Sequence, residues 1–207
     1  MKLSLTSSII ILNSVFFLIF FIPVFYSKLA VNYIALQPAS IIEGKYLWTF
    51  ITSMIMHADL IHLLVNMVSL FFIGSLVERL IGTRRYIWLY LLSGLFAGIF
   101  FVGIAYLTSA NLNAYAVGAS GAIFGLGGVL MFLTPDLPVY LMFIPIPIKM
   151  KYAIPILLLA LWALSLSIGL PVGNTAHLGG LIVGVLYGSY LRTKYKKKVM
   201  MISNHFR

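Results

Sequence analysis

Residues 118–135 read GASGAIFGLGGVLMFLTP, an apolar, glycine-rich segment with Ser120 near its beginning and Pro135 at its end. A second apolar, glycine-rich segment farther along the chain begins Ala176-His177-Leu178-Gly179-Gly180. Polar side chains inside a membrane are unfavourable and usually have a function. A serine and a histidine are the side chains that form a nucleophile and its general base. We therefore expect Ser120 and His177 to be catalytic residues of a membrane-embedded hydrolase.

The composition indicates a membrane protein. Of the 207 residues, 62% are hydrophobic and 9% are charged, and the mean hydropathy is +1.07. Soluble domains are about 45–50% apolar and about 25% charged. A transmembrane helix needs about 20 apolar residues. On this basis the predicted spans are 9–26, 60–78, 86–107, 119–133, 152–170 and 175–191.

These spans predict an all-α fold, a bundle of six transmembrane helices in a single domain, residues 1–207, with a basic tail at 193–207. We expect residues 9–26 to be a retained span and not a signal peptide, because only Lys2 precedes the apolar run and no small-x-small cleavage site follows it. The chain contains no cysteine, which excludes disulfides and thiol chemistry.

The net charge of +10 is distributed as in a membrane protein. With the N-terminus inside, all of the 14 Lys and Arg residues except Lys28 and Lys45 fall in cytoplasmic segments, which is the positive-inside pattern. The pattern predicts that both termini are cytoplasmic in a cell membrane and that the tail lies beside anionic lipid. It argues against a nucleic-acid partner.

This topology predicts a recessed catalytic site. Spans four and six both run from outside to inside, so Ser120 and His177 lie near their outer ends. Residues 118–134 extend only about 25 Å as a helix, which is too short to cross the hydrocarbon core. We therefore expect a short fourth helix and a loop, 108–117, that dips into the membrane beside a water-filled cavity.

Glycine spacing predicts that spans four and six pack closely. Small residues at every fourth position allow helices to approach each other in lipid. The glycines concerned are Gly180, Gly184 and Gly188 on span six, and Gly121, Gly125 and Gly128 on span four.

A second polar group lies on span two. His62 and Asn66 share one helical face near the outer end, where their side chains are hydrogen-bond donors suited to stabilising an oxyanion. Glu78, at the inner end, is expected to be a helix cap or an interhelical hydrogen-bond acceptor. Asp59 is expected to cap the helix. His57 lies just outside the span, and its role is left open between an interfacial residue and part of the site.

Together these motifs resemble those of the rhomboid family of intramembrane serine proteases, in its six-span prokaryotic form. The motifs are His57-x4-His62-x3-Asn66, Gly74-x3-Glu78-x3-Gly82, Gly118-x-Ser120-Gly121 and Ala176-His177-x2-Gly180-x3-Gly184.

The resemblance implies particular roles for these residues. It implies Ser120 as nucleophile, His177 as general base, and an oxyanion hole of His62, Asn66 and the Ser120 backbone N–H. It also implies supporting roles for Gly118, Gly121 and Phe124. The implied substrates are single-span membrane proteins cut near the outer end of the span, and no cofactor is implied.

Two positions depart from the family pattern. Trp48-Thr49 stands where many members have Trp-Arg in the first external loop. Phe124 stands where a tyrosine is often found, so we expect it to stack on His177 without offering a hydroxyl.

Other chemistries are less consistent with the sequence. A His-Glu-x-x-His zinc motif is absent. Asp59 and Asp136 lie at opposite interfaces, so they do not form an aspartyl dyad or complete a triad. A metal bound by His57, His62 and His177 is a further alternative, and we expect no metal. The alternatives from other classes are a catalytically inactive relative that binds membrane clients, and a small transporter.

Overall fold

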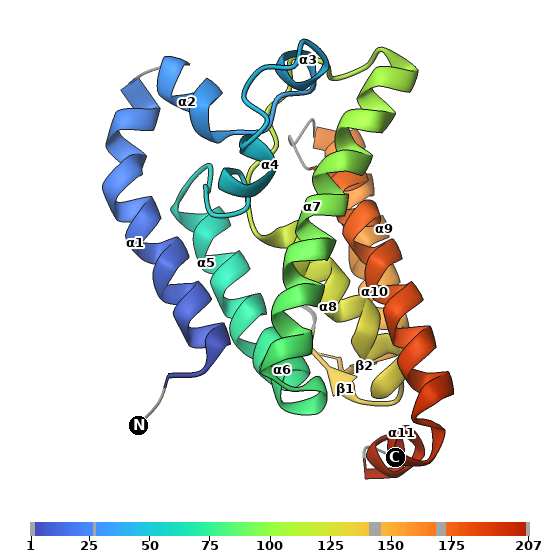
Figure 1. Cartoon of the computed structure of the whole chain (residues 1–207). Helices are drawn as coiled ribbons and strands as arrows, with labels where there is room; N and C mark the ends of the chain where they lie inside the picture. The colour runs from blue at the N-terminus through green and yellow to red at the C-terminus, as the bar shows by residue number, and fades with distance from the viewer. Residues whose placement is uncertain (1–2, 27, 141–145, 169–172, 206–207) are drawn as a thin grey trace.

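The computed structural model describes residues 3–26, 28–140, 146–168 and 173–205, which form a mostly helical bundle (Figure 1). A helix covers each predicted span, although Leu170, the expected end of span five, lies outside the described residues. The long helical segments are α1 (Leu5–Tyr26), α5 (Leu60–Ser69) continued by η1 (Leu70–Gly74) and α6 (Ser75–Ile81), α7 (Thr83–Thr108), α8 (Ser120–Leu133), α9 (Met150–Ile168) and α10 (Asn174–Lys194).

Shorter elements connect the long helices. Between α1 and α5 the chain forms α2 (Lys28–Ile34), α3 (Pro38–Ile42) and α4 (Thr49–Thr52). Between α8 and α9, strands β1 (Pro138–Val139) and β2 (Ile148–Lys149) pair antiparallel, and α11 (Lys196–His205) follows α10.

Among the described residues, three helical segments are long and apolar enough to cross a membrane: Leu60–Ile81, Thr83–Thr108 and Met150–Ser167. Leu5–Phe20 and Ser120–Leu133 are apolar but shorter. The apolar groups on the outside of the bundle, such as Leu18, Ile61 and Leu166, are 75% to 82% exposed, as expected for side chains that contact lipid.

Helix α8 is the central element of the bundle. Every residue from Gly121 to Leu130 is buried, and α7, α9 and α10 pack around the helix. Its 14 residues extend about 21 Å. Figure 1 shows that α8 begins part-way down the bundle, well below the upper end of α7, so Ser120 lies in the interior.

The glycines predicted to bring α8 and α10 together do so. A Cβ atom at Gly184 would lie 2.8 Å from the carbonyl carbon of Gly125, and one at Gly180 would lie 2.7 Å from the carbonyl carbon of Gly121. Real Cβ atoms essentially never approach backbone so closely. The two helices are therefore in backbone contact along most of α8.

Glu78 fixes the beginning of α1 to the lower end of α6. Its carboxylate accepts hydrogen bonds from the backbone N–H groups of Leu5 (3.1 Å) and Thr6 (2.9 Å), and from the hydroxyls of Thr6 (2.7 Å) and Thr83 (3.0 Å). Free N–H groups at a helix N-terminus favour an anion. The expectation that Glu78 is a cap and an interhelical acceptor is confirmed.

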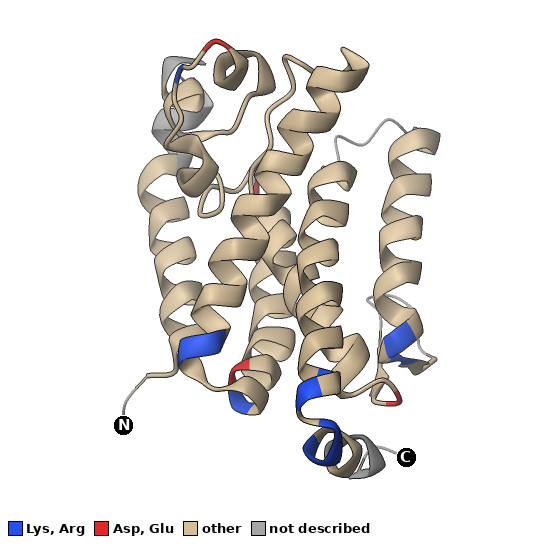
Figure 2. Cartoon of the chain, turned by 45° about the vertical axis from the view of Figure 1, so that its right-hand side comes forward, with Lys and Arg blue, Asp and Glu red and all other residues tan. Residues whose placement is uncertain are grey.

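The described Lys and Arg residues gather at the end of the bundle where both termini lie (Figure 2). Lys28, the first residue of α2, and Lys45, in the loop between α3 and α4, are exceptions, and Lys45 pairs with Glu43 at 2.7 Å. Arg85, in the first turn of α7, donates to the hydroxyl of Tyr195 (3.1 Å), which lies between α10 and α11, and its guanidinium lies over the Tyr195 ring. The expected basic tail is thus largely helical and is attached to the lower end of α7.

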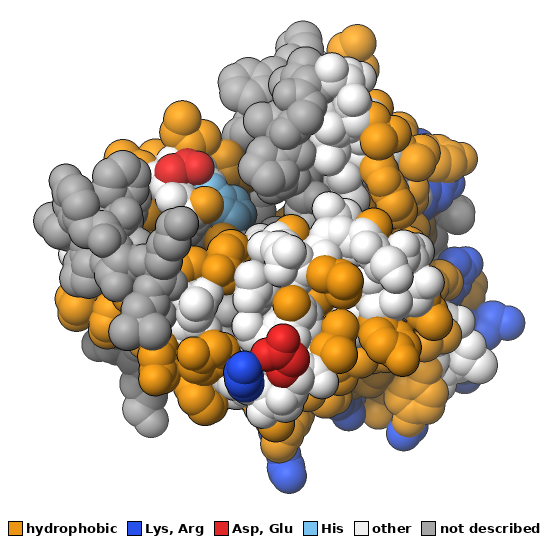
Figure 3. Space-filling view, turned by 90° about the horizontal axis from the view of Figure 1, so that it is seen from above, with side chains coloured by type: hydrophobic (Ala, Val, Ile, Leu, Met, Phe, Trp, Pro, Cys, Tyr) orange, Lys and Arg blue, Asp and Glu red, His pale blue; other side chains and the backbone are white. Residues whose placement is uncertain are grey.

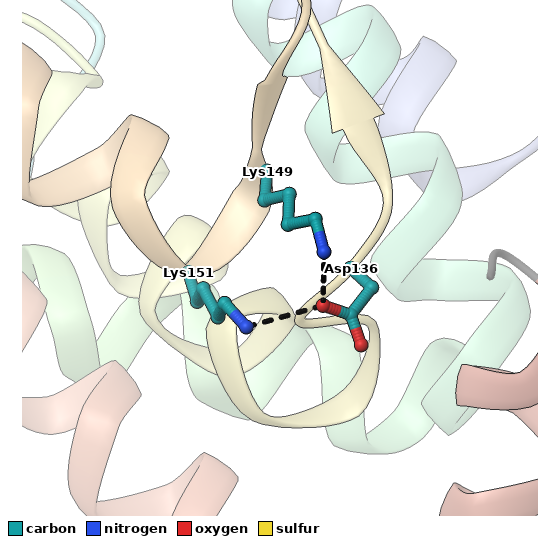
Figure 4. A network of polar contacts seen from close by, with 3 residues as sticks. All are labelled: Asp136, Lys149 and Lys151. Atoms are coloured by element: carbon teal, nitrogen blue, oxygen red, sulfur yellow. Dashed lines mark hydrogen bonds and ion pairs between the residues drawn. The ribbon is translucent and has the colours of Figure 1, made fainter.

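A small ion network joins the chain segments on either side of β1 and β2 (Figure 4). Asp136 lies 3.1 Å from the Lys151 ammonium and 3.3 Å from that of Lys149. The hydrogen bonds from Lys151 and Lys149 hold the pKa of the Asp136 carboxyl below its ordinary value. The network connects the end of α8 to the beginning of α9.

The loop between α3 and α4, where Trp48-Thr49 departs from the Trp-Arg pattern, is held by other contacts. The Trp48 indole donates to the Tyr33 carbonyl (2.9 Å), and its ring packs against Tyr33 and Tyr46. Thr49 is 1% exposed, and its hydroxyl donates to the Tyr46 carbonyl (2.7 Å). Aromatic packing and one buried hydroxyl therefore fix this turn.

Candidate active site

The backbone before α8 positions Ser120. Gly118 has φ +111°, a conformation that only glycine adopts readily, and its N–H donates to the Ser53 carbonyl at 2.8 Å. A Cβ at Gly118 would lie 2.9 Å from both Cε1 and Nε2 of His62. Glycine is therefore required by the dihedral angle and by the close approach of the imidazole.

Ser120 and His177 form a direct hydrogen bond. The Ser120 Oγ, at the first residue of α8, lies 2.7 Å from His177 Nε2 in the first turns of α10. The Phe124 ring stacks on the imidazole with centroids 4.7 Å apart and planes 21° from parallel. This is the stack expected from the sequence, and it fixes the plane of the imidazole.

His62 lies beside Gly118 and Ser120 and has a defined orientation. Asp59 caps α5 by accepting from the His62 N–H at 2.7 Å, as expected, and the Ala58 N–H points at His62 Nδ1 at 3.4 Å. Because Nδ1 faces a donor, a neutral His62 carries its hydrogen on Nε2. Nε2 lies close to Gly118, two residues before Ser120.

Asn66 lies one turn after His62 and is 3% exposed. Its amide nitrogen donates to the His62 carbonyl at 2.8 Å, and its Oδ1 has no hydrogen-bond partner within the described part of the chain. An amide nitrogen carries two hydrogens, so one remains beyond the bond to His62.

All of these side chains line one cavity of about 1110 Å³. Its wall includes Ser120, His177, His62 and Asn66, together with apolar side chains of α1 and α9. In the view onto the upper end of the molecule, an imidazole is visible beside a hollow in the surface (Figure 3). The cavity is large enough for water and for an extended segment of peptide.

The structure places His57 in the wall of this cavity and not at the interface. The residue is 4% exposed, and its ring packs edge-on against that of His62 at 5.2 Å. In the described ranges, no three His, Cys, Asp or Glu side chains gather as metal ligands would.

Two features of the site were missed by sequence reasoning. The Ser53 carbonyl, which receives the Gly118 N–H, has no sequence signal because backbone acceptors depend on the fold alone. Asn174 lines the same cavity and is 7% exposed. It did have a sequence signal, because it is a polar residue one helical turn before His177.

The chain belongs to the rhomboid family: the model of the Rhomboid domain matches residues 44–194. It is accordingly an all-α membrane protein, and the family resemblance noted in the motifs is confirmed.

Individual relatives agree with this assignment. The putative rhomboid protease YdcA of Bacillus subtilis is 31% identical over 191 residues, which cover 92% of this chain and 89% of that protein. The rhomboid protease AarA of Providencia stuartii is 31% identical over 173 residues, 73% and 59% of the two chains. RHOMBOID-like protein 1 of Arabidopsis thaliana is 36% identical over 157 residues, 74% of this chain and 37% of the relative. The chain spans less than half of the Arabidopsis proteins that it matches.

Proposed function

We propose that the protein is an intramembrane serine endopeptidase in which Ser120 and His177 form a catalytic dyad. The observation that carries this proposal is the 2.7 Å contact between Ser120 Oγ and His177 Nε2 inside a cavity surrounded by apolar helices. A hydroxyl hydrogen-bonded to a neutral imidazole is the arrangement of an activated nucleophile.

The reaction follows from this geometry. His177 Nε2 accepts the Ser120 proton as Oγ attacks the peptide carbonyl, and the carbonyl oxygen becomes an oxyanion. His177 then gives the proton to the leaving amine, which departs and leaves an acyl-enzyme. Water, deprotonated by the same imidazole, hydrolyses the ester and restores Ser120.

Three donors are suited to stabilise the oxyanion. They are the Nε2–H of His62, the remaining amide hydrogen of Asn66, and the backbone N–H of Ser120, which is among the N–H groups at the beginning of α8 that have no partner within the helix. Preorganised donors in a site that excludes bulk water stabilise charge more strongly than water does.

The substrates are proposed to be single-span membrane proteins cut near the outer end of the span. A helix hides its carbonyls in its own hydrogen bonds, so the scissile segment must unwind to enter the cavity. We place the protein in the cell membrane with six spans, α8 as the short recessed helix, and both termini cytoplasmic. The gathering of positive charge at the end that carries the termini supports this orientation.

The test uses purified protein reconstituted in vesicles with a single-span model substrate. Ser120→Ala is expected to abolish cleavage and fluorophosphonate labelling while the protein stays folded. Ser189→Ala, at an exposed serine of α10, is the matched control and should cleave normally. Cleavage of the same bond by Ser120→Ala at the normal rate would refute the serine mechanism. Loss of activity on chelation, restored by zinc, would do so as well.

A further inference from the structure

The first turn of α10 contains two buried polar atoms without a hydrogen-bond partner among the described residues. They are Oδ1 of Asn174 and Nδ1 of His177, and both residues are 7% exposed. Buried polar groups are nearly always paired, so these two atoms require an explanation.

The proton on His177 has a defined position. Because Nε2 faces the Ser120 hydroxyl, the neutral imidazole that accepts the serine proton carries its own hydrogen on Nδ1. Nδ1–H is therefore a buried donor that needs an acceptor, and during the reaction it belongs to an imidazolium that an acceptor would stabilise.

None of the four acidic residues of the chain supplies that acceptor. Asp59 caps α5 and Glu78 caps α1. Asp136 is held by two lysines beyond the lower end of α8, and Glu43 pairs with Lys45. The titratable side chains that share the cavity with His177 are His57, His62, Asp59 and Tyr115.

Asn174 is well placed to supply the acceptor for the hydrogen on His177 Nδ1. Residues three apart on a helix lie on one face with Cβ atoms about 5–6 Å apart, and both Asn174 and His177 line the cavity. A carboxamide oxygen accepts hydrogen bonds and carries no charge. It would orient the imidazole and fix its tautomer without favouring the protonated form as a carboxylate does.

We propose that Asn174 is a positioning residue of the dyad, whose Oδ1 accepts the hydrogen on His177 Nδ1, either after rotation of the amide or through one water in the cavity. The proposal rests on the proposed protease function and adds a third, uncharged member to the Ser120–His177 pair.

The experiment compares Asn174→Ala and Asn174→Asp with the wild type in vesicles, measuring kcat, KM and the pH profile of kcat. Ser189→Ala is the matched control, because Ser189 is an exposed polar residue of the same helix that lies outside the cavity lining. Asn174→Ala should lower kcat on the order of tenfold, the effect of one hydrogen bond, with KM unchanged. The rate of fluorophosphonate labelling should fall by the same factor.

Asn174→Asp gives the sharper result. The substitution keeps the acceptor but adds a charge that favours the imidazolium. At alkaline pH, kcat should therefore return toward the wild-type value. The acid limb of the pH profile should move upward by about one pH unit. A residue that only supported folding would lower the melting temperature without moving this limb.

Two outcomes would overturn the proposal: a kcat for Asn174→Ala equal to that of Ser189→Ala, or an unmoved acid limb in Asn174→Asp. If Asn174→Ala fails to fold, the pH profile of Asn174→Asp decides alone. Ser120→Ala, assayed in parallel, distinguishes failure of the protease mechanism from failure of this inference. Cleavage by that variant at the normal rate would refute the protease mechanism and this inference together. If Ser120→Ala is inactive and the acid limb of Asn174→Asp is unmoved, this inference alone is refuted.

Discussion

Replacing Gly184 by alanine tests whether the contact between α8 and α10 sets the catalytic geometry. The added Cβ would lie 2.8 Å from the carbonyl carbon and 2.9 Å from the Cα of Gly125. Nonbonded carbons are best placed about 3.5–4.0 Å apart, and the Gly125 carbonyl oxygen would be closer still to the added Cβ. The helices must therefore separate by at least about 0.6–1.2 Å. The obstacle is backbone, which cannot rotate away as a side chain can.

The separation should affect both stability and activity. Overpacking of this kind costs about 1–3 kcal/mol, which for a chain of this size lowers the melting temperature by about 2–12 °C. A comparable shift at the dyad would stretch the 2.7 Å contact between Ser120 and His177 beyond hydrogen-bonding range. We therefore expect kcat to fall at least about tenfold.

Gly103→Ala is the matched control. Gly103 lies inside α7, and a Cβ there would meet no atom within 4 Å. The substitution should leave activity unchanged and stabilise the helix slightly, by about 0.4–1 kcal/mol. Thermal unfolding in detergent and cleavage in vesicles measure both variants. If Gly184→Ala matched Gly103→Ala in melting temperature and kcat, the glycine contact would not set the distance between these helices.

Three further predictions concern the site and the ion network. Asn66→Ala should lower kcat by about 10²–10³-fold with little change in KM, because an oxyanion donor acts mainly on the transition state; a higher KM at unchanged kcat would make Asn66 a binding residue instead. Phe124→Leu should lower kcat by about 2–10-fold through loss of the stack, and Phe124→Tyr, which keeps a ring, should not. Asp136→Asn should lower the melting temperature slightly at neutral pH. The contribution of the Asp136 carboxylate is present above its ordinary pKa of 3.8 and is lost as the pH falls through its lowered value, so the two melting curves should converge in that acid range; a difference that persisted there would have another cause.

The sequence predicted the helices and the candidate dyad because both depend on local patterns. Apolar runs fix the spans, and glycines three or four positions apart identified the faces of α8 and α10 that touch. Long-range features were less accessible. Helix α1 begins at Leu5 and not at the predicted Ile9, because a carboxylate more than 70 residues away, that of Glu78, satisfies its first N–H groups.

Other features depend on backbone geometry that no residue type reveals. The π-helical turn at Leu70–Gly74 interrupts a segment that reads as a regular helix. The contact between the Gly118 N–H and the Ser53 carbonyl exists only once the first loop has folded beside α8. Sequence reasoning therefore identified the groups that we propose react, but not the contacts that place them.

The uneven distribution of positive charge has a consequence for where cleavage products would go. In the proposed topology, inverting the molecule would carry the lysines and arginines of α10 and α11 across the membrane, against about 2.3 kcal/mol per charge for each 100 mV of membrane potential. Insertion would therefore commit every copy to one orientation before any substrate is met. The fragment on the outer side of the cut would be released away from the cytoplasm, so charges far from the scissile bond would decide on which side of the membrane that fragment appears.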